Sequence, residues 1–229
     1  MKNESKSVGE KKMKSLMVIL MLGAMLLSAQ ALGSNLIVNG NFEAGNTGFG
    51  SDYMYKSPGA WALWDPETYT VHTNPYDVHY HWASFGDYTS GYGNMMIVNS
   101  AENGTPSVWY QTVDVEPETF YGFSYWICLA SDEAPPLLQT SINGDEVGQF
   151  DASSASAWTQ LSYIWYSGDD TTATIEFINL NPVYAGGDFA IDDILMDEIQ
   201  RASIAVHDVQ ITSVDLDTGT VTGSYCISN

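Results

Sequence analysis

The sequence has few basic residues. Seven Lys and Arg residues stand against 28 Asp and Glu, which gives a formal net charge of −21 at pH 7. A negative field of this strength repels nucleic-acid phosphates and anionic lipid headgroups. We therefore expect neither nucleic acid nor a membrane surface as a partner, which leaves neutral ligands and cations.

Cysteine is also scarce, because the chain has two, Cys128 and Cys226. Two cysteines cannot staple a small scaffold, so the fold must rest on an apolar core. Export would permit a disulfide between them, and the sequence leaves open whether they meet.

The apolar run near the N-terminus, Leu16–Leu27, is shorter than the roughly 18 to 20 residues that span a bilayer. It follows five lysines and precedes Ala29-Gln30-Ala31. That order predicts a signal peptide over residues 1–31 and an extracellular, bacterial-type secreted protein, with a membrane anchor as the alternative. Cleavage would leave Lys56 and Arg201 against 26 acidic residues, a formal charge of −24.

Helical periodicity is missing from the rest of the chain, which is rich in Tyr, Trp, Val, Ile and Thr. Short apolar runs separated by turn residues predict an all-β, jelly-roll sandwich over residues 35–198. The expected strands are 36–38, 61–64, 69–73, 95–98, 108–115, 120–129, 137–142, 158–166, 173–178 and 189–196. Residues 203–229 are predicted to form a β-rich tail or the start of an incomplete second domain.

Two segments carry a family resemblance. Asn35–Glu43 reads NLIVNGNFE, and Gly187–Ile194 reads GDFAIDDI. Together they resemble the two ends of extracellular carbohydrate-binding modules with the galactose-binding-like jelly roll. The resemblance implies a structural Ca²⁺ whose ligands include Glu43 and Asp192. Jelly-roll termini lie close in space, and a cation relieves the repulsion between two carboxylates.

The candidate ligand site lies in and beside a long insertion, residues 74–94. Carbohydrate binding needs exposed rings that stack on sugar faces, beside polar groups that bind hydroxyls. The sequence offers Trp61, Trp64, Tyr80, Trp82, His79 and Asp87 as ligand-binding residues. His79 and His81 could also be metal ligands, although structural hydrogen bonding is the favoured interpretation.

The chain has no Gly-x-Ser-x-Gly, phosphate-binding glycine loop or His-Glu-x-x-His motif. We therefore expect a secreted, non-catalytic module that binds a neutral glycan or polysaccharide and carries structural calcium. One alternative is a structural or adhesive surface domain, part of a larger extracellular protein, whose aromatic residues fill the core. A glycoside hydrolase is the other.

Overall fold

The computed structural model describes residues 35–131, 133–151, 157–183 and 185–199, and the strands 205–215 and 220–228. The predicted signal peptide lies outside these residues. Residues 32–199 form one compact unit, and the last two strands belong to another. Among the described residues, no helix has the length and apolarity needed to cross a bilayer.

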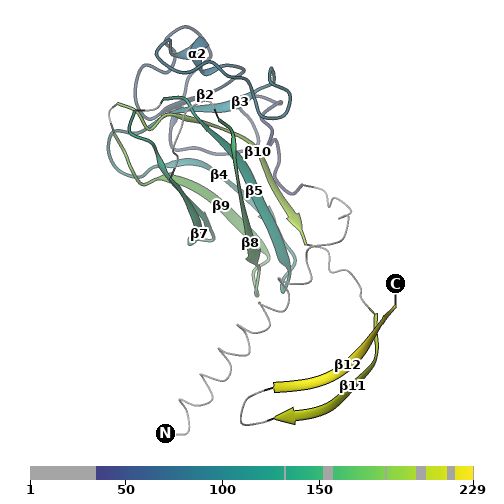
Figure 1. Ribbon diagram of the computed structural model, residues 1–229. Helices are drawn as coiled ribbons and strands as arrows, with labels where there is room; N and C mark the ends of the chain where they lie inside the picture. Colours follow the sequence, from purple (N-terminus) through teal and green to yellow (C-terminus); the bar gives the residue numbers. More distant parts are fainter. Residues whose placement is uncertain are drawn as a thin grey trace, which may run out of the picture. The chain divides into compact units, whose positions relative to one another are not determined.

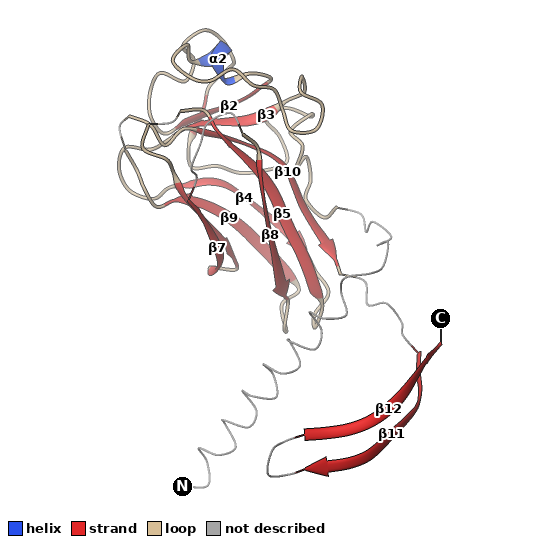
Figure 2. Ribbon diagram, viewed as in Figure 1, coloured by secondary structure: helices blue, strands red, loops and turns tan. Residues whose placement is uncertain are grey.

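The main unit is a β-sandwich, as the sequence predicted, with one short helix (Figures 1 and 2). Its elements are β1 (Met54–Tyr55), β2 (Thr68–His72), α2 (Pro75–Val78), β3 (Met95–Asn99), β4 (Ser107–Asp114), β5 (Phe120–Leu129), β6 (Leu137–Ile142), β7 (Asp145–Asp151), β8 (Thr159–Tyr166), β9 (Thr172–Asn179) and β10 (Phe189–Glu198). One sheet has the order β1-β2-β3-β10-β5-β8, and the other has the order β4-β9-β6-β7.

The core lies between the two sheets and follows the alternation of the strands. On β5 the side chains of Tyr121, Phe123, Tyr125 and Ile127 are buried. They pack against residues of the four-stranded sheet such as Phe177, whose ring lies 4.5 Å from that of Tyr125. The two-residue period of β5 therefore determines which face enters the core.

A tight turn joins β6 to β7, where the sequence has Asn143-Gly144. Both residues have positive φ, 54° and 83°. Asn and Gly tolerate this conformation, which explains the hairpin. The β7 strand itself was missing from the predicted set.

Two predicted strands are wrong. Residues 36–38 and 61–64 form turns. Trp61 has φ 62°, and Ala62 N–H bonds the Gly59 carbonyl, so the chain reverses there instead of extending.

The N-terminal segment still lies beside the last strand of the sandwich, where a jelly roll places it. Leu36 N–H bonds Met196 O at 2.9 Å, and Ile194 N–H bonds Gly40 O at 2.9 Å. The register of β10 against β5 shifts between Asp192 and Leu195. This bulge separates the buried Asp192 from Ile194, which faces the core.

The insertion covers part of the outer face of the six-stranded sheet. Leu63, Val78 and Trp82 pack with Met95 and Ile97 of β3 in a second buried apolar cluster. Asn74 caps helix α2, because its side chain accepts the N–H of Tyr76 at 3.0 Å. The part of the insertion around Val78 and Trp82 is therefore packed on the sheet.

The other unit contains an antiparallel pair, β11 (Ala205–Asp215) and β12 (Thr220–Ser228). The sequence predicted strands in both places.

Candidate functional site

A cavity of about 390 Å³ opens beside the second apolar cluster. We call it the aromatic pocket. Its lining consists of Trp64, Pro66, His79, His81, Trp82, Asn99, Ser131, Glu133, Ala185, Gly186 and Asp188. Four predicted ligand residues thus lie in or beside one hollow: Trp64, His79 and Trp82 in the wall, and Trp61 against Trp64.

The exposed part of the pocket wall is built from tryptophan. Trp64 is 59% exposed and Trp61 is 37% exposed. Their ring centroids lie 5.1 Å apart, and Trp61 also contacts Tyr80 at 4.9 Å. The rings brace one another edge to face, which leaves ring surface available to a ligand.

Trp82 and Asp188 form the buried part of the pocket, each only 6% exposed. Trp82 Nε1–H donates to Asp188 Oδ2 at 3.0 Å, and Ser100 N–H donates to Oδ1 at 3.1 Å. Burial raises the pKa of Asp188 to about 7, although these two hydrogen bonds oppose the shift. The carboxylate is therefore fixed in position and poorly solvated.

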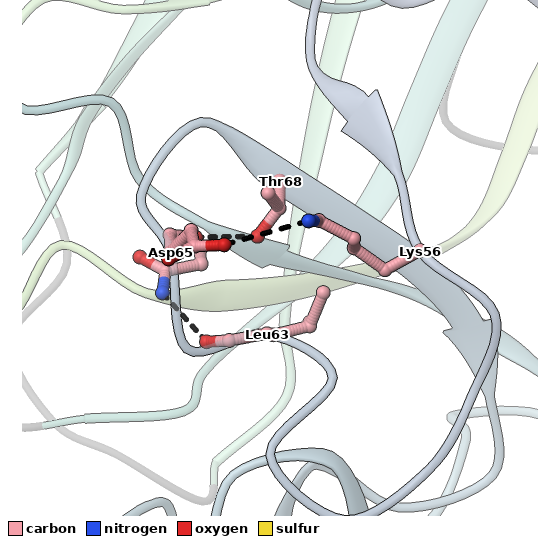
Figure 3. A network of polar contacts seen from close by, with 5 residues as sticks. Lys56, Leu63, Asp65 and Thr68 are labelled. Carbon is pink, nitrogen blue, oxygen red and sulfur yellow. Dashed lines mark hydrogen bonds and ion pairs between the residues drawn. The ribbon is translucent and has the colours of Figure 1, made fainter.

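Polar contacts anchor the loop that carries Trp61 and Trp64 (Figure 3). Asn99 Nδ2–H donates to Leu63 O at 2.7 Å, and Thr68 Oγ1–H donates to Asp65 O at 2.6 Å. Lys56 Nζ lies 3.4 Å from Asp65 Oδ2. The loop is thereby tied to β2 and β3 on both sides of Trp64.

The opposite rim of the pocket depends on a glycine. Gly186 has φ 91°, and a Cβ there would overlap the Glu133 carbonyl. The next residue, Gly187, donates its N–H to that carbonyl at 3.0 Å. This close approach holds the Glu133 segment beside Asp188.

The ring of His79 contacts both the exposed and the buried tryptophan rings. Its ring is 4.5 Å from Trp82 and 5.7 Å from Trp64. Burial, and then the charge of His81, lower the pKa of His79, so it is neutral at pH 7. Its Nδ1 is buried and has no hydrogen-bond partner among the described residues.

Asp87 lies in a different place from the other predicted ligand residues. It begins an acidic loop, which we define as residues 87–94. Its carboxylate accepts hydrogen bonds from Ser90 N–H at 2.9 Å and Gly93 N–H at 2.7 Å. Burial alone would raise the pKa of Asp87, but these bonds lower it below its ordinary value. Asp87 therefore folds its own loop.

The two residues expected to bind calcium contact this acidic loop. Glu43 Oε1 accepts Asn94 N–H at 2.7 Å, and Asp192 Oδ2 accepts Tyr88 N–H at 3.0 Å. Asp192 is 1% exposed. Burial, and then the neighbouring charges of Asp193 and Asp87, raise its pKa to about 7. Both carboxylates thus accept backbone hydrogen bonds from the same loop.

A second hollow, of about 430 Å³, lies over the outer face of β5 and β8. Its aromatic residue, Trp126, is covered by Tyr88, with ring centroids 3.5 Å apart and planes 14° apart. Because that ring is already stacked, this hollow offers a ligand less aromatic surface than the aromatic pocket does.

The sequence reasoning missed several polar residues of the aromatic pocket. Asp188 was part of the motif GDFAIDDI but received no role, and the others are Asn99, Ser131 and Glu133. Asp188 directly precedes a buried strand, which was an available signal. The other three stand at strand ends that only the folded chain brings together.

No protein-family model matches the sequence, and no curated protein does. The structure is similar to a Stig cyclase from Fischerella sp. TAU, with a TM-score of 0.52 and 11% identity over 73% of this chain and 98% of that one. It is also similar to the CBM22-1 xylan-binding domain of Paenibacillus barcinonensis Xyn10C, with a TM-score of 0.47 and 14% identity over 76% of this chain and 100% of that one. TmCBM61 in complex with β-1,4-galactotriose gives a TM-score of 0.47 and 15% identity over 72% of this chain and 99% of that one. At these identities the likeness to the cyclase concerns the fold alone.

Proposed function

We propose that this chain is a secreted, non-catalytic module that binds a carbohydrate in the aromatic pocket. The carrying observation is the pair of exposed rings, Trp61 and Trp64, beside a cavity that also contains Asp188. Tryptophan faces stack on the apolar faces of sugars, and fixed carboxylate and amide groups bind the hydroxyls. The pocket volume, about 390 Å³, falls in the range of small-ligand sites.

Exposure of the rings argues against the purely adhesive alternative. In that alternative the insertion aromatics would fill the core. Trp82 does so, but Trp64 and Tyr80 are 59% and 43% exposed. A surface tryptophan held by anchored loops is an ordered contact surface that a ligand can use without a large loss of side-chain entropy.

The test is retention on immobilised polysaccharides, followed by titration with oligomers of the one retained. Trp64→Ala should weaken binding at least about tenfold, because truncating a tryptophan at the centre of an interface typically costs about 2 kcal/mol or more. Tyr92→Ala is the matched control, since Tyr92 is 81% exposed but lies on the acidic loop. Retention on no polysaccharide, or equal loss in both variants, would contradict the proposal.

We also propose a calcium ion at the acidic loop, with Glu43 and Asp192 among its ligands. A cation there would favour the ionised form of the buried Asp192. Apart from Lys56, residues 35–199 contain no Lys or Arg whose positive charge could stabilise the ionised form of Asp192. Backbone carbonyls or water would complete the oxygen ligands, because the described residues include no group of three His, Cys, Asp or Glu that could hold a metal.

The calcium proposal predicts a shift in thermal stability. Calcium at about 100 times its dissociation constant should stabilise the fold by about 2.7 kcal/mol and raise Tm, and a chelator should reverse the shift. Asp192→Asn should remove the response. A wild-type melting curve that neither calcium nor chelator moves would contradict it.

Glycoside hydrolysis is the second candidate function, and one observation favours it. The raised pKa of Asp188, about 7, suits a general acid, and Glu133 supplies a second carboxylate in the same pocket. However, both Asp188 oxygens accept hydrogen bonds from the protein, which suits a fixed acceptor. The test is to measure new reducing ends after incubation with a polysaccharide. If the wild-type chain releases them and the Asp188→Asn variant does not, the pocket is a catalytic site and the binding proposal is wrong.

A further inference from the structure

The charged side chains of the aromatic pocket carry one sign. Among the residues that the structure describes, the acidic ones that line it are Asp188 and Glu133, and no Lys or Arg lines it. The other titratable groups facing it are His79, whose lowered pKa leaves it neutral at pH 7, and His81. A ligand therefore meets two acidic side chains and no Lys or Arg, and Asp188, whose pKa is about 7, is partly ionised at pH 7.

Other parts of the unit cannot supply the missing positive charge. Lys56 is the sole Lys or Arg in residues 35–199, and it pairs with Asp65 at 3.4 Å. The carboxylate of Asp188 is buried, so solvent screens it poorly. A cationic group of a ligand would be the natural partner for it.

The aromatic wall favours a cation for a separate reason. The faces of Trp and other aromatic rings carry negative electrostatic potential and attract ammonium groups within about 6 Å. Trp64 and Trp82 line the pocket, with ring centroids 5.7 and 4.5 Å from that of His79. Trp82 is buried, but Trp64 is 59% exposed and can offer its ring to a ligand, so this ring and the acidic side chains act in the same direction.

We propose that the aromatic pocket selects saccharides that carry an ammonium group, such as amino sugars with a free amine, over neutral sugars and over uronic acids. This inference rests on the proposed carbohydrate-binding function and adds the chemical class of the ligand. A carboxylate-bearing sugar would be repelled by Asp188 and Glu133. A neutral sugar would stack on Trp64 but gain nothing from the negative field.

The sharpest test compares two oligomers that differ at one position of each ring. Tetramers of β-1,4-linked glucosamine and of β-1,4-linked glucose carry an ammonium group and a hydroxyl, respectively, at C2. The titration is run at about pH 6 and again at about pH 7, because a ring amine is less basic than a peptide α-amino group, whose pKa is about 7.7 to 8.0, and must be protonated to test the preference. A bound ammonium group would also lower the pKa of Asp188, which burial and then the charge of Glu133 raise to about 7. A galacturonate oligomer is the third probe.

We expect the glucosamine tetramer to bind at least about tenfold more tightly than the glucose tetramer, since one desolvated cation–π contact is worth about that much. The galacturonate oligomer should bind most weakly. Asp188→Asn and Glu133→Gln should each reduce the ratio of the first two affinities. Asp114→Asn is the control, because Asp114 is exposed on β4 and lies outside the pocket lining.

The outcomes separate this inference from the function on which it rests. Equal affinity for the glucosamine and glucose tetramers would overturn the ammonium preference and leave carbohydrate binding intact. A folded wild-type chain that binds no oligosaccharide would overturn both. If Asp188→Asn does not fold, Glu133→Gln decides the question, since Glu133 is exposed and its removal leaves no buried group unpaired.

Discussion

The aromatic pocket and the acidic loop both place a buried aspartate beside the insertion, yet the two carboxylates have different surroundings. Asp188 accepts hydrogen bonds from Trp82 and Ser100 and borders a cavity of about 390 Å³. Asp192 accepts hydrogen bonds from the backbone of Tyr88 and Asp193, and two further acids lie against the same loop.

This difference shows that the partners of a buried carboxylate, more than its burial, indicate its role. Burial raises both pKa values to about 7. At the acidic loop the neighbouring groups are backbone amides and other carboxylates, which suits loop folding and a cation. At the aromatic pocket Asp188 also accepts a backbone N–H, from Ser100, and has Glu133 nearby, but it bonds the indole of Trp82 and borders an open cavity, which suits an organic ligand.

The largest expected effect is on the pH dependence of stability. In a chelator, the free energy of unfolding should fall as the pH rises from about 4 to about 8. The folded protein holds the protons of Asp188 and Asp192 up to about pH 7, while the unfolded chain releases them near 3.8. Each group contributes on the order of a few kcal/mol.

Denaturant titrations over this pH range measure the effect. Asp188→Asn should remove the part of the slope that comes from the aromatic pocket, and the remaining fall comes from Asp192 and from Asp197, whose pKa burial also raises. Calcium should make the free energy of unfolding of the Asp188→Asn variant depend less on pH, because a bound cation lowers the pKa of Asp192. Stability that rises steadily from pH 4 to 8 in the wild-type chain would mean that neither aspartate is desolvated.

A smaller loss of stability should come from Gly93→Ala, which adds a methyl group in the acidic loop. In Gly93→Ala the new Cβ would overlap the Glu43 carboxylate and lie 2.9 Å from Asp87 Oδ2. Overpacking of this kind costs about 1 to 3 kcal/mol. Thermal melts should show the loss, while oligosaccharide affinity in the aromatic pocket should stay within about twofold.

Gly91→Ala separates crowding from backbone strain. Gly91 has φ 83°, but a Cβ added there would meet no atom within 4 Å, so the strain of a positive φ is its sole cost, about 1 kcal/mol. A Gly93→Ala variant as stable as Gly91→Ala would show that the two carboxylates are less tightly placed than described. A large loss of ligand affinity would show that the two regions are coupled.

Much of the sandwich could be predicted because β-strand alternation is local. The core face of β5 and the Asn143-Gly144 turn follow from residue order, whereas the pairing of the N-terminal segment with β10 was expected from the family resemblance of the two segments. The strand prediction at residues 61–64 was wrong. The apolar residues there resemble a strand, but the backbone of Trp61 is in the left-handed region and turns the chain.

The candidate site was harder to predict because its parts come from distant segments. Sequence proximity placed Asp87 with the histidines and tryptophans, whereas Asp87 bonds Ser90 and Gly93 in its own loop. Asp188 lies 106 residues from Trp82 and still forms the central hydrogen bond of the pocket. Such a contact depends on how β10 enters the sheet, which composition and spacing do not encode.

The central claim is that ligand binds in the aromatic pocket, and the indole N–H signals in an NMR titration test it most directly. With an oligomer of the retained polysaccharide, the signals of Trp61, Trp64 and Trp82 should shift in proportion to saturation. The signal of Trp158, whose Nε1–H donates to Gly86 O, should stay in place. Shifts confined to Trp126 and Trp158 would place the ligand on the outer face of β5 and β8 and contradict the account.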